Sequence, residues 1–92
     1  MQVVWTEPAL NGIALAYDYI FEFNPQAAMR VADTLRTEGD SLEHFPQGGR
    51  PVPGTNMREL ISTYPYIIRY RIDGDRVIIL RIRHTARRPT RP

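Results

Sequence analysis

The chain has 92 residues, of which 42% are hydrophobic and 24% are charged, and its formal net charge at pH 7 is +2. These values indicate one small globular domain over residues 1–92 rather than a disordered chain. Because the sequence contains no cysteine, disulfides, zinc–thiolate sites and a thiol nucleophile are excluded.

The charged residues are unevenly placed. All twelve basic residues are arginines, and most of them lie in the last quarter of the chain. The codon usage of a GC-rich genome can explain the lack of lysine without a functional cause. The clustering favours a phosphate-bearing or acidic partner, although a solvated strand face followed by a frayed tail would give the same pattern.

A strand and two helices are predicted for the first half of the chain. Gln2 to Trp5 form a short β-type run, and Thr6 is a suitable N-cap for a helix that continues to about Phe23. A second helix is expected from Pro25 to about Leu42, packed antiparallel to the first because the connection is so short. The expected core residues are Leu10, Ile13, Tyr17, Ile20, Phe21, Ala9, Ala16 and Phe23 in the first helix, and Ala28, Val31, Ala32, Leu35 and Leu42 in the second.

Two features interrupt this regular pattern. Gly39 is expected to weaken the second helix near its end. Residues 44–56, HFPQGGRPVPGTN, are rich in proline and glycine, which excludes a helix or a central strand and predicts an ordered loop inside the domain. Met57 to Ser62 then predict another strand.

The segment Tyr66 to His84, YIIRYRIDGDRVIILRIRH, predicts the centre of the sheet. Two alternating runs flank Asp73-Gly74-Asp75, the pattern of an antiparallel hairpin with one apolar face and one arginine-bearing face. With a three-residue loop, the expected opposed pairs are Tyr70–Ile78, Ile68–Leu80 and Tyr66–Ile82.

The predicted element order is β-αα-βββ. It corresponds to an α+β fold in which an antiparallel helical hairpin packs on one face of a small antiparallel sheet. Residues 85–92, TARRPTRP, have little to bury and are expected to form a loose tail.

Short sequence elements follow one another along the chain in a specific order: Trp5-Thr6, Tyr19-Ile20, Asn24-Pro25, Pro46, Gly49-Arg50, Arg58-Glu59-Leu60, Tyr66 to Ile72, Ile79 to His84, and Arg87. Together they resemble the ParE/RelE superfamily of bacterial type II toxins, and ParE more closely. The resemblance implies a toxin silenced by a co-expressed antitoxin, whose C-terminal segment wraps the toxin as helix and extended strand. It also implies a target, since ParE-like members poison DNA gyrase whereas RelE-like members cut messenger RNA in the ribosomal A site.

The alternative function, a messenger-RNA endoribonuclease, makes chemical demands that the sequence meets poorly. Such an enzyme must activate a 2′-hydroxyl, protonate the leaving oxygen and stabilise charge on the phosphate. The RelE-like pattern uses a lysine cluster and a C-terminal tyrosine, but this chain has no lysine and no tyrosine after Tyr70. Arginine stays protonated and is a poor proton donor or acceptor. We therefore favour a gyrase inhibitor that is not an enzyme. The candidate nuclease residues would be Arg58, Arg81, Arg83 and His84, with Glu59 as a spare carboxylate.

Several arginines are candidates for binding the target. Those near the chain end share the face opposite the predicted core and are expected to be solvated, because burying four unpaired guanidiniums would be prohibitive. Arg50, which follows two glycines, either contacts phosphate or anchors its own loop. His84 lies on the apolar face of its strand, where it is expected to cap the core by hydrogen bonding. The candidate target-binding residues are Arg81, Arg83, Arg87 and Arg88.

Other classes of site and partner receive less support. Two histidines without a nearby pair of carboxylates make a poor metal site, and we expect no cofactor. The longest aliphatic run, Val77 to Leu80, is too short for a membrane span, so a cytoplasmic protein without a membrane partner is expected. A non-toxic binding module, such as a degenerate toxin, stays open on the charge pattern. Tyr66 and Tyr70 fall on the expected buried face and offer no stacking platform for single-stranded nucleic acid.

Overall fold

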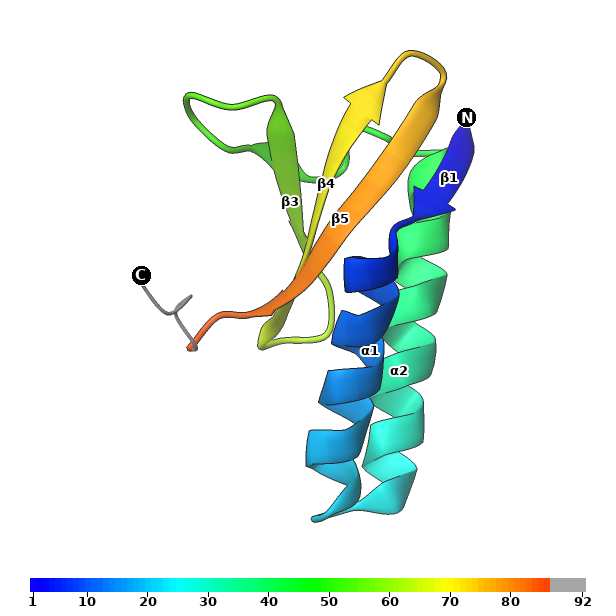
Figure 1. The fold of residues 1–92 in the computed structure, drawn as a ribbon, viewed down its shortest axis with the longest axis vertical. Helices are drawn as coiled ribbons and strands as arrows, with labels where there is room; N and C mark the ends of the chain where they lie inside the picture. The colour runs from blue at the N-terminus through cyan, green and yellow to red at the C-terminus, as the bar shows by residue number, and fades with distance from the viewer. Residues whose placement is uncertain (87–92) are drawn as a thin grey trace.

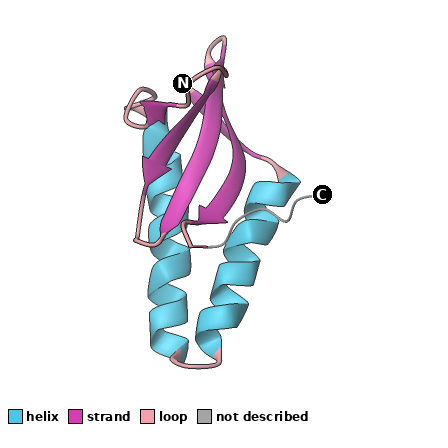
Figure 2. Ribbon diagram, turned by 90° about the vertical axis from the view of Figure 1, so that its left-hand side faces the viewer, coloured by secondary structure: helices cyan, strands magenta, loops and turns pink. Residues whose placement is uncertain are grey.

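A computed structural model describes residues 1–86 of the chain. Helices α1 (Glu7–Phe21) and α2 (Pro25–Asp40) form an antiparallel hairpin on one face of a five-stranded sheet, and the hairpin extends beyond the sheet (Figures 1 and 2). We call the sheet face that the helices cover the inner face and the opposite one the outer face. The strands are β1 (Gln2–Trp5), β2 (Arg50–Pro51), β3 (Met57–Ile61), β4 (Tyr66–Asp73) and β5 (Arg76–His84), in the order β1-β5-β4-β3-β2.

This arrangement confirms the α+β class and the helical hairpin on one face of the sheet. The sheet is mixed rather than wholly antiparallel, because β1 runs parallel to β5 at its edge. Thr6 fixes this junction, since its backbone N–H and its hydroxyl both donate to the carbonyl oxygen of Ile79, at 3.2 and 2.7 Å. Neither helix of the described residues is long and apolar enough to cross a membrane.

The two helices begin where the sequence predicts. The Thr6 hydroxyl accepts a hydrogen bond from the Ala9 N–H at 3.3 Å, and the Asn24 side chain accepts one from the Ala27 N–H at 3.0 Å. Each cap satisfies a backbone donor that has no partner within its helix. α1 ends at Phe21, and a short 3₁₀ helix, Ser41–Glu43, follows α2.

The core lies between the helical hairpin and the inner face of the sheet. α1 approaches β5 closely through small residues: a side chain at Gly12 would lie 2.9 Å from the Cβ of Ile82. This approach turns a narrow stripe of α1 inward, so the expectation that Leu10, Phe21 and Phe23 belong to the core is wrong, and all three are exposed. The buried cluster comprises Ala9, Ala16, Leu35, Leu42, Tyr66, Ile68, Tyr70, Val77 and Ile79.

Gly39 has a packing role that the sequence did not reveal. The six-membered ring of Trp5 packs directly on it, and a Cβ at this position would lie 2.4 Å from the ring. The indole N–H of Trp5 also donates to the carboxylate of Asp40 at 2.8 Å. The missing side chain therefore lets β1 and α2 meet, an effect distinct from the expected weakening of the helix.

The hairpin of β4 and β5 has a different register from the predicted one. Asp73 pairs with Arg76, so the loop contains two residues, Gly74 and Asp75, and Gly74 has a φ of 64°. Glycine adopts this conformation without strain, which suits the first position of a two-residue hairpin loop. The predicted pairs Tyr70–Ile78, Ile68–Leu80 and Tyr66–Ile82 are wrong, and the observed ones are Tyr70–Ile79, Ile68–Ile82 and Tyr66–His84.

A β-bulge at Leu80 makes this register possible. Arg69 pairs with Arg81 while the next residue, Tyr70, pairs with Ile79, which leaves Leu80 without a partner in β4. An extra residue of this kind reverses the alternation of side chains along the strand that contains it. The inner-face residues of β5 are therefore Val77 and Ile79 before the bulge and Ile82 and His84 after it.

Candidate functional site

The outer face carries a row of charged residues that crosses four strands. Arg50 on β2 pairs with Glu59 on β3, Glu59 with Arg69 on β4, and Arg69 with Arg81 on β5. Paired residues of antiparallel strands share a face, so these four side chains lie on the same side of the sheet. Together with Arg83, which also lies on this face, we call them the outer-face cluster.

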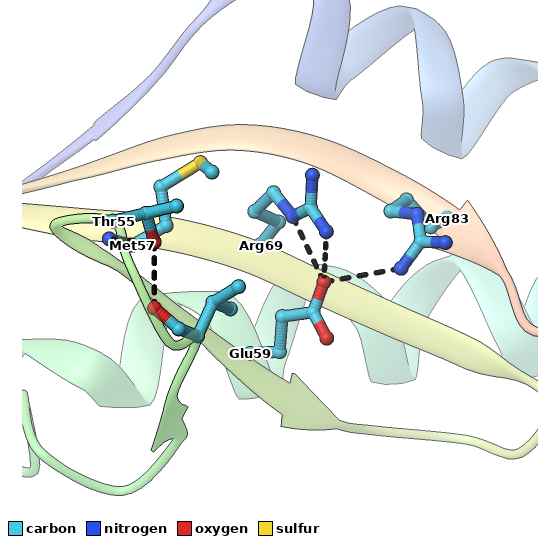
Figure 3. A network of polar contacts seen from close by, with 6 residues as sticks. Thr55, Met57, Glu59, Arg69 and Arg83 are labelled. Carbon is cyan, nitrogen blue, oxygen red and sulfur yellow. Dashed lines mark hydrogen bonds and ion pairs between the residues drawn. The ribbon is translucent and has the colours of Figure 1, made fainter. Parts of the chain in front are cut away.

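Glu59 is the centre of this cluster (Figure 3). Its Oε2 accepts hydrogen bonds from Nε of Arg69 at 2.8 Å, from Nη2 of Arg69, and from Nη1 of Arg83 at 3.0 Å. The Glu59 side chain is 18% exposed, and those of Arg69 and Arg83 are 27% exposed. One carboxylate oxygen thus holds two guanidinium groups together in a partly desolvated setting.

Arg81 and Arg50 occupy the two ends of the row and are exposed. Arg81 stands directly opposite Arg69, and like charges in such a cross-strand pair repel each other. The outer-face cluster contains four arginines and one glutamate, so its net charge is 4 − 1 = +3. An anion bound on this face would relieve the repulsion.

The structure places the predicted target-binding residues as follows. Arg81 and Arg83 lie on the face opposite the core, as predicted. The expectation that both are fully solvated is wrong for Arg83, because its ion pair with Glu59 draws it against the sheet. Arg87 and Arg88 lie outside the described residues.

The loop before β3 is held by Arg58 and Tyr70 from the inner face. Nε of Arg58 donates to the carbonyl oxygen of Gly49 at 2.9 Å. The hydroxyl of Tyr70 accepts from the Gly49 N–H and donates to the carbonyl oxygen of Pro46, both at 2.8 Å. The loop anchor is therefore Arg58, whereas Arg50 points to the outer face and is available for a ligand.

His84 lies on the inner face with the core. Its ring packs edge-to-face on Tyr66, with 5.2 Å between the centroids, and its Nδ1 accepts from the backbone N–H of Ala86 at 3.1 Å. The four candidate nuclease residues are therefore not brought together: Arg58 and His84 lie on the inner-face side, and Arg81 and Arg83 on the outer face. Within residues 1–86, no three acidic or histidine side chains gather to form a metal site.

Comparison with known families agrees with the fold and the element order. The model of the ParE toxin of the type II toxin-antitoxin system parDE matches residues 3–89. The chain belongs to the ParE toxin family. It is therefore a toxin of the type II toxin-antitoxin class, a class in which the toxin has a cognate antitoxin.

Curated relatives of this ParE-family toxin carry RelE-type as well as unspecific names. The chain is 48% identical over 86 residues to "Toxin RelE2" of Caulobacter vibrioides, covering 94% of this chain and 97% of the relative. It is 39% identical over 84 residues to "Putative toxin Y4kP" of Sinorhizobium fredii, covering 90% and 86%. A solved structure of the chromosomal ParDE system from P. aeruginosa shares the fold, with a TM-score of 0.82, 24% identity, and coverage of 91% and 95%.

The sequence interpretation missed the central roles of Glu59 and Arg69 in this toxin. From the sequence alone, Glu59 is a spare carboxylate and Arg69 is one of twelve arginines. The signal in the sequence is the alternation of side chains along a strand, which places Glu59 of β3 and Arg69 of β4 on the outer face. Recognising the pair requires the register between two strands, which neither segment specifies alone.

Proposed function

We propose that this ParE-family toxin poisons DNA gyrase and is neutralised by its cognate antitoxin. The observation that carries the proposal is the family match over residues 3–89, together with the resemblance that links ParE-like toxins to gyrase. The separation of Arg58 and His84 from Arg81 and Arg83 also favours binding over RNA cleavage, because a nuclease needs its acid, base and phosphate ligands around one atom.

Arg81 is the first candidate for the contact with gyrase. It is exposed at the end of the outer-face cluster, where its guanidinium can bind a carboxylate or a phosphate through two parallel hydrogen bonds. Arg83 lies beside it but is engaged by Glu59. Arg87 and Arg88 are proposed to extend the same contact.

A gyrase supercoiling assay tests this proposal with the purified toxin. We expect the wild-type protein to inhibit supercoiling and to increase the amount of cleaved DNA trapped on gyrase, and Arg81→Ala to lose most of this effect. Arg30→Ala is the matched control, because Arg30 is exposed on α2 and its removal changes the net charge equally. A variant that carries Arg81→Ala and ends after His84 should not inhibit gyrase. If it still inhibits gyrase fully, the contact with gyrase lies elsewhere on the toxin.

A second candidate function, ribosome-dependent cleavage of messenger RNA, is favoured by one specific observation. Glu59 lies beside Arg69 and Arg83 on the outer face. A carboxylate can act as a general base, and neighbouring guanidiniums can stabilise the charge on a phosphate. The relative named RelE2 points in the same direction. Cleavage of ribosome-bound messenger RNA that disappears in Glu59→Gln would establish this function instead of gyrase poisoning.

The antitoxin is proposed to bind away from the outer face. A groove of about 450 Å³ lies between α1 and α2, and its lining combines apolar residues such as Leu10 and Ala14 with the charged residues Asp18, Asp33 and Arg36. Such a mixed surface suits an amphipathic helix. β2 pairs with only Arg58 and Glu59 of β3, so an extended antitoxin segment could add to the rest of that strand.

Thermal unfolding measures this interaction. A C-terminal antitoxin peptide at one hundred times its dissociation constant adds about 2.7 kcal/mol to the stability of the toxin. A peptide that leaves the midpoint unchanged at saturation would contradict this site. Arg81→Ala should retain the full stabilisation, because the proposed target and antitoxin surfaces are on different faces.

A further inference from the structure

The outer-face cluster has the features of a binding surface for a particular kind of partner. We propose that it binds an extended, acidic stretch of polypeptide, with Arg81 and Arg50 as contact residues and Glu59 as a positioning residue. The inference deepens the proposed function and rests on it for the identity of the target.

The free protein contains a repulsion between two arginines of the outer-face cluster. Arg69 and Arg81 are directly opposed on neighbouring strands, an arrangement that destabilises a sheet when both residues carry the same charge. Glu59 neutralises Arg69 from one side only, on the strand away from Arg81. A partner carboxylate above Arg81 and Arg69 would complete the alternation of charge across the row.

Glu59 orients the two guanidinium groups beside it. All three hydrogen bonds from Arg69 and Arg83 end on the same oxygen, Oε2. A guanidinium has five N–H donors, so these bonds use three of the ten donors in the two groups. Glu59 therefore holds two partly desolvated guanidiniums in place while leaving them donors for a second acid, which lowers the entropy lost on binding.

The side chains around the cluster favour a polypeptide as the partner. Apolar side chains share the outer face with the cluster: Ile61 is 50% exposed, and Met57 and Ile67 are half-buried. The strand tyrosines, Tyr66 and Tyr70, instead lie on the inner face. Single-stranded nucleic acid is usually bound by aromatic side chains that stack on bases, whereas aliphatic side chains among arginines suit a polypeptide with alternating acidic and apolar residues.

The spacing of the row sets the spacing of the acidic residues. Arg50 and Arg81 lie three strands apart in register, which corresponds to about 14 Å at the usual distance between strands. An extended chain rises about 3.4 Å per residue, so acids four positions apart span about the same distance. A segment with two glutamates four positions apart would therefore meet both ends of the row, Arg50 and Arg81.

Fluorescence anisotropy with defined probes tests this inference on the full-length toxin. The probes are a labelled decapeptide of alternating glutamate and valine, the same peptide with glutamine in place of glutamate, and a single-stranded RNA of ten nucleotides. We expect the glutamate peptide to bind more tightly than the other two. The double variant Arg50→Ala, Arg81→Ala should weaken its binding about tenfold, because each exposed ion pair contributes up to about fivefold.

Two control proteins separate the surface from net charge and from misfolding. Arg30→Ala with Arg76→Ala removes two arginines, one on α2 and one beside the β4–β5 turn, and should leave peptide affinity nearly unchanged. The melting temperature of each variant should stay close to that of the wild type, since all four arginines are exposed. A conservative substitution gives a further readout: Arg81→Lys should bind the glutamate peptide more tightly than Arg81→Ala, because lysine restores the positive charge.

Three results would overturn the inference. If both double variants lose the same affinity for the glutamate peptide, binding depends on net charge and not on this surface. Tighter binding of the RNA than of the glutamate peptide would make the face a phosphate surface. Binding unaffected by Arg50 and Arg81 would remove the contact from the cluster. Gyrase plays no part in this assay, so intact peptide binding without gyrase inhibition would refute the proposed target and leave the surface standing.

Discussion

Replacing Glu59 by glutamine keeps the shape of the side chain but removes the charge that holds Arg69 and Arg83. Three hydrogen bonds end on one carboxylate oxygen. A hydrogen bond to a charged group contributes about 1 kcal/mol more than a neutral one, which gives about 3 kcal/mol for the set. Partial exposure of all three side chains lowers this value through solvent screening, and we expect a loss of about 2 kcal/mol.

The expected loss is large enough to measure by calorimetry or by circular dichroism during heating. For a domain of this size, about 2 kcal/mol corresponds to a fall in melting temperature of about 8–16 °C. Asp73→Asn is the matched control, because Asp73 also lies near two arginines, Arg71 and Arg76, each at 3.9 Å. The Asp73 side chain is more than half exposed, so its replacement should cost less than about 1 kcal/mol.

Ionic strength distinguishes the two sites further. At 1 M salt the Debye length is about 3 Å, and the small effect of Asp73→Asn should vanish. The effect of Glu59→Gln should largely persist, because its partners are close and partly desolvated. Equal losses in the two variants, or a Glu59→Gln protein as stable as the wild type, would show that the central carboxylate does not organise the outer face.

Three further substitutions test individual contacts. Gly39→Ala should destabilise the protein by about 1 kcal/mol in urea unfolding, because crowding of Trp5 outweighs the gain in helix propensity; a stabilised variant would contradict this packing. Tyr70→Phe should cost about 1–3 kcal/mol and speed hydrogen exchange at the Gly49 amide, which loses its buried acceptor; unchanged exchange would show that the hydroxyl does not hold the loop. His84→Ala should leave gyrase inhibition intact and cost about 1 kcal/mol, the value of an edge-to-face ring contact; complete loss of gyrase inhibition in a folded variant would place His84 in the contact with gyrase.

The helical half of the fold was predictable because its signals are local. Thr6 and Asn24 are each followed directly by a proline-containing first turn, and both cap their helices as expected. The extent of the buried stripe was less predictable, because Phe23 lies past the helix end and is 73% exposed. Which apolar residues of an amphipathic helix become buried depends on how closely the sheet approaches, and that is set by Gly12 and Ile82.

The charged centre of the candidate site could not be predicted, since it depends on pairings between strands. Glu59 and Arg69 are ten residues apart, and Glu59 and Arg83 are twenty-four apart. Composition shows only an excess of arginine, and alternation shows only that some arginines share a face. The identity of the one carboxylate among them follows from the register of β3 on β4, which the sequence does not specify by itself.

The four aliphatic residues Val77 to Leu80 explain both the wrong register and the right placement of the arginines. A strictly alternating strand with Val77 and Ile79 on the inner face, as observed, would also turn Arg81 and Arg83 inward. Burial of two guanidiniums against the helices would cost far more than a local irregularity. The bulge at Leu80, the last residue of the aliphatic run, reverses the alternation just before Arg81. Because either phase of such a run looks apolar, the change of phase is invisible in the sequence, and the outer-face cluster depends on it.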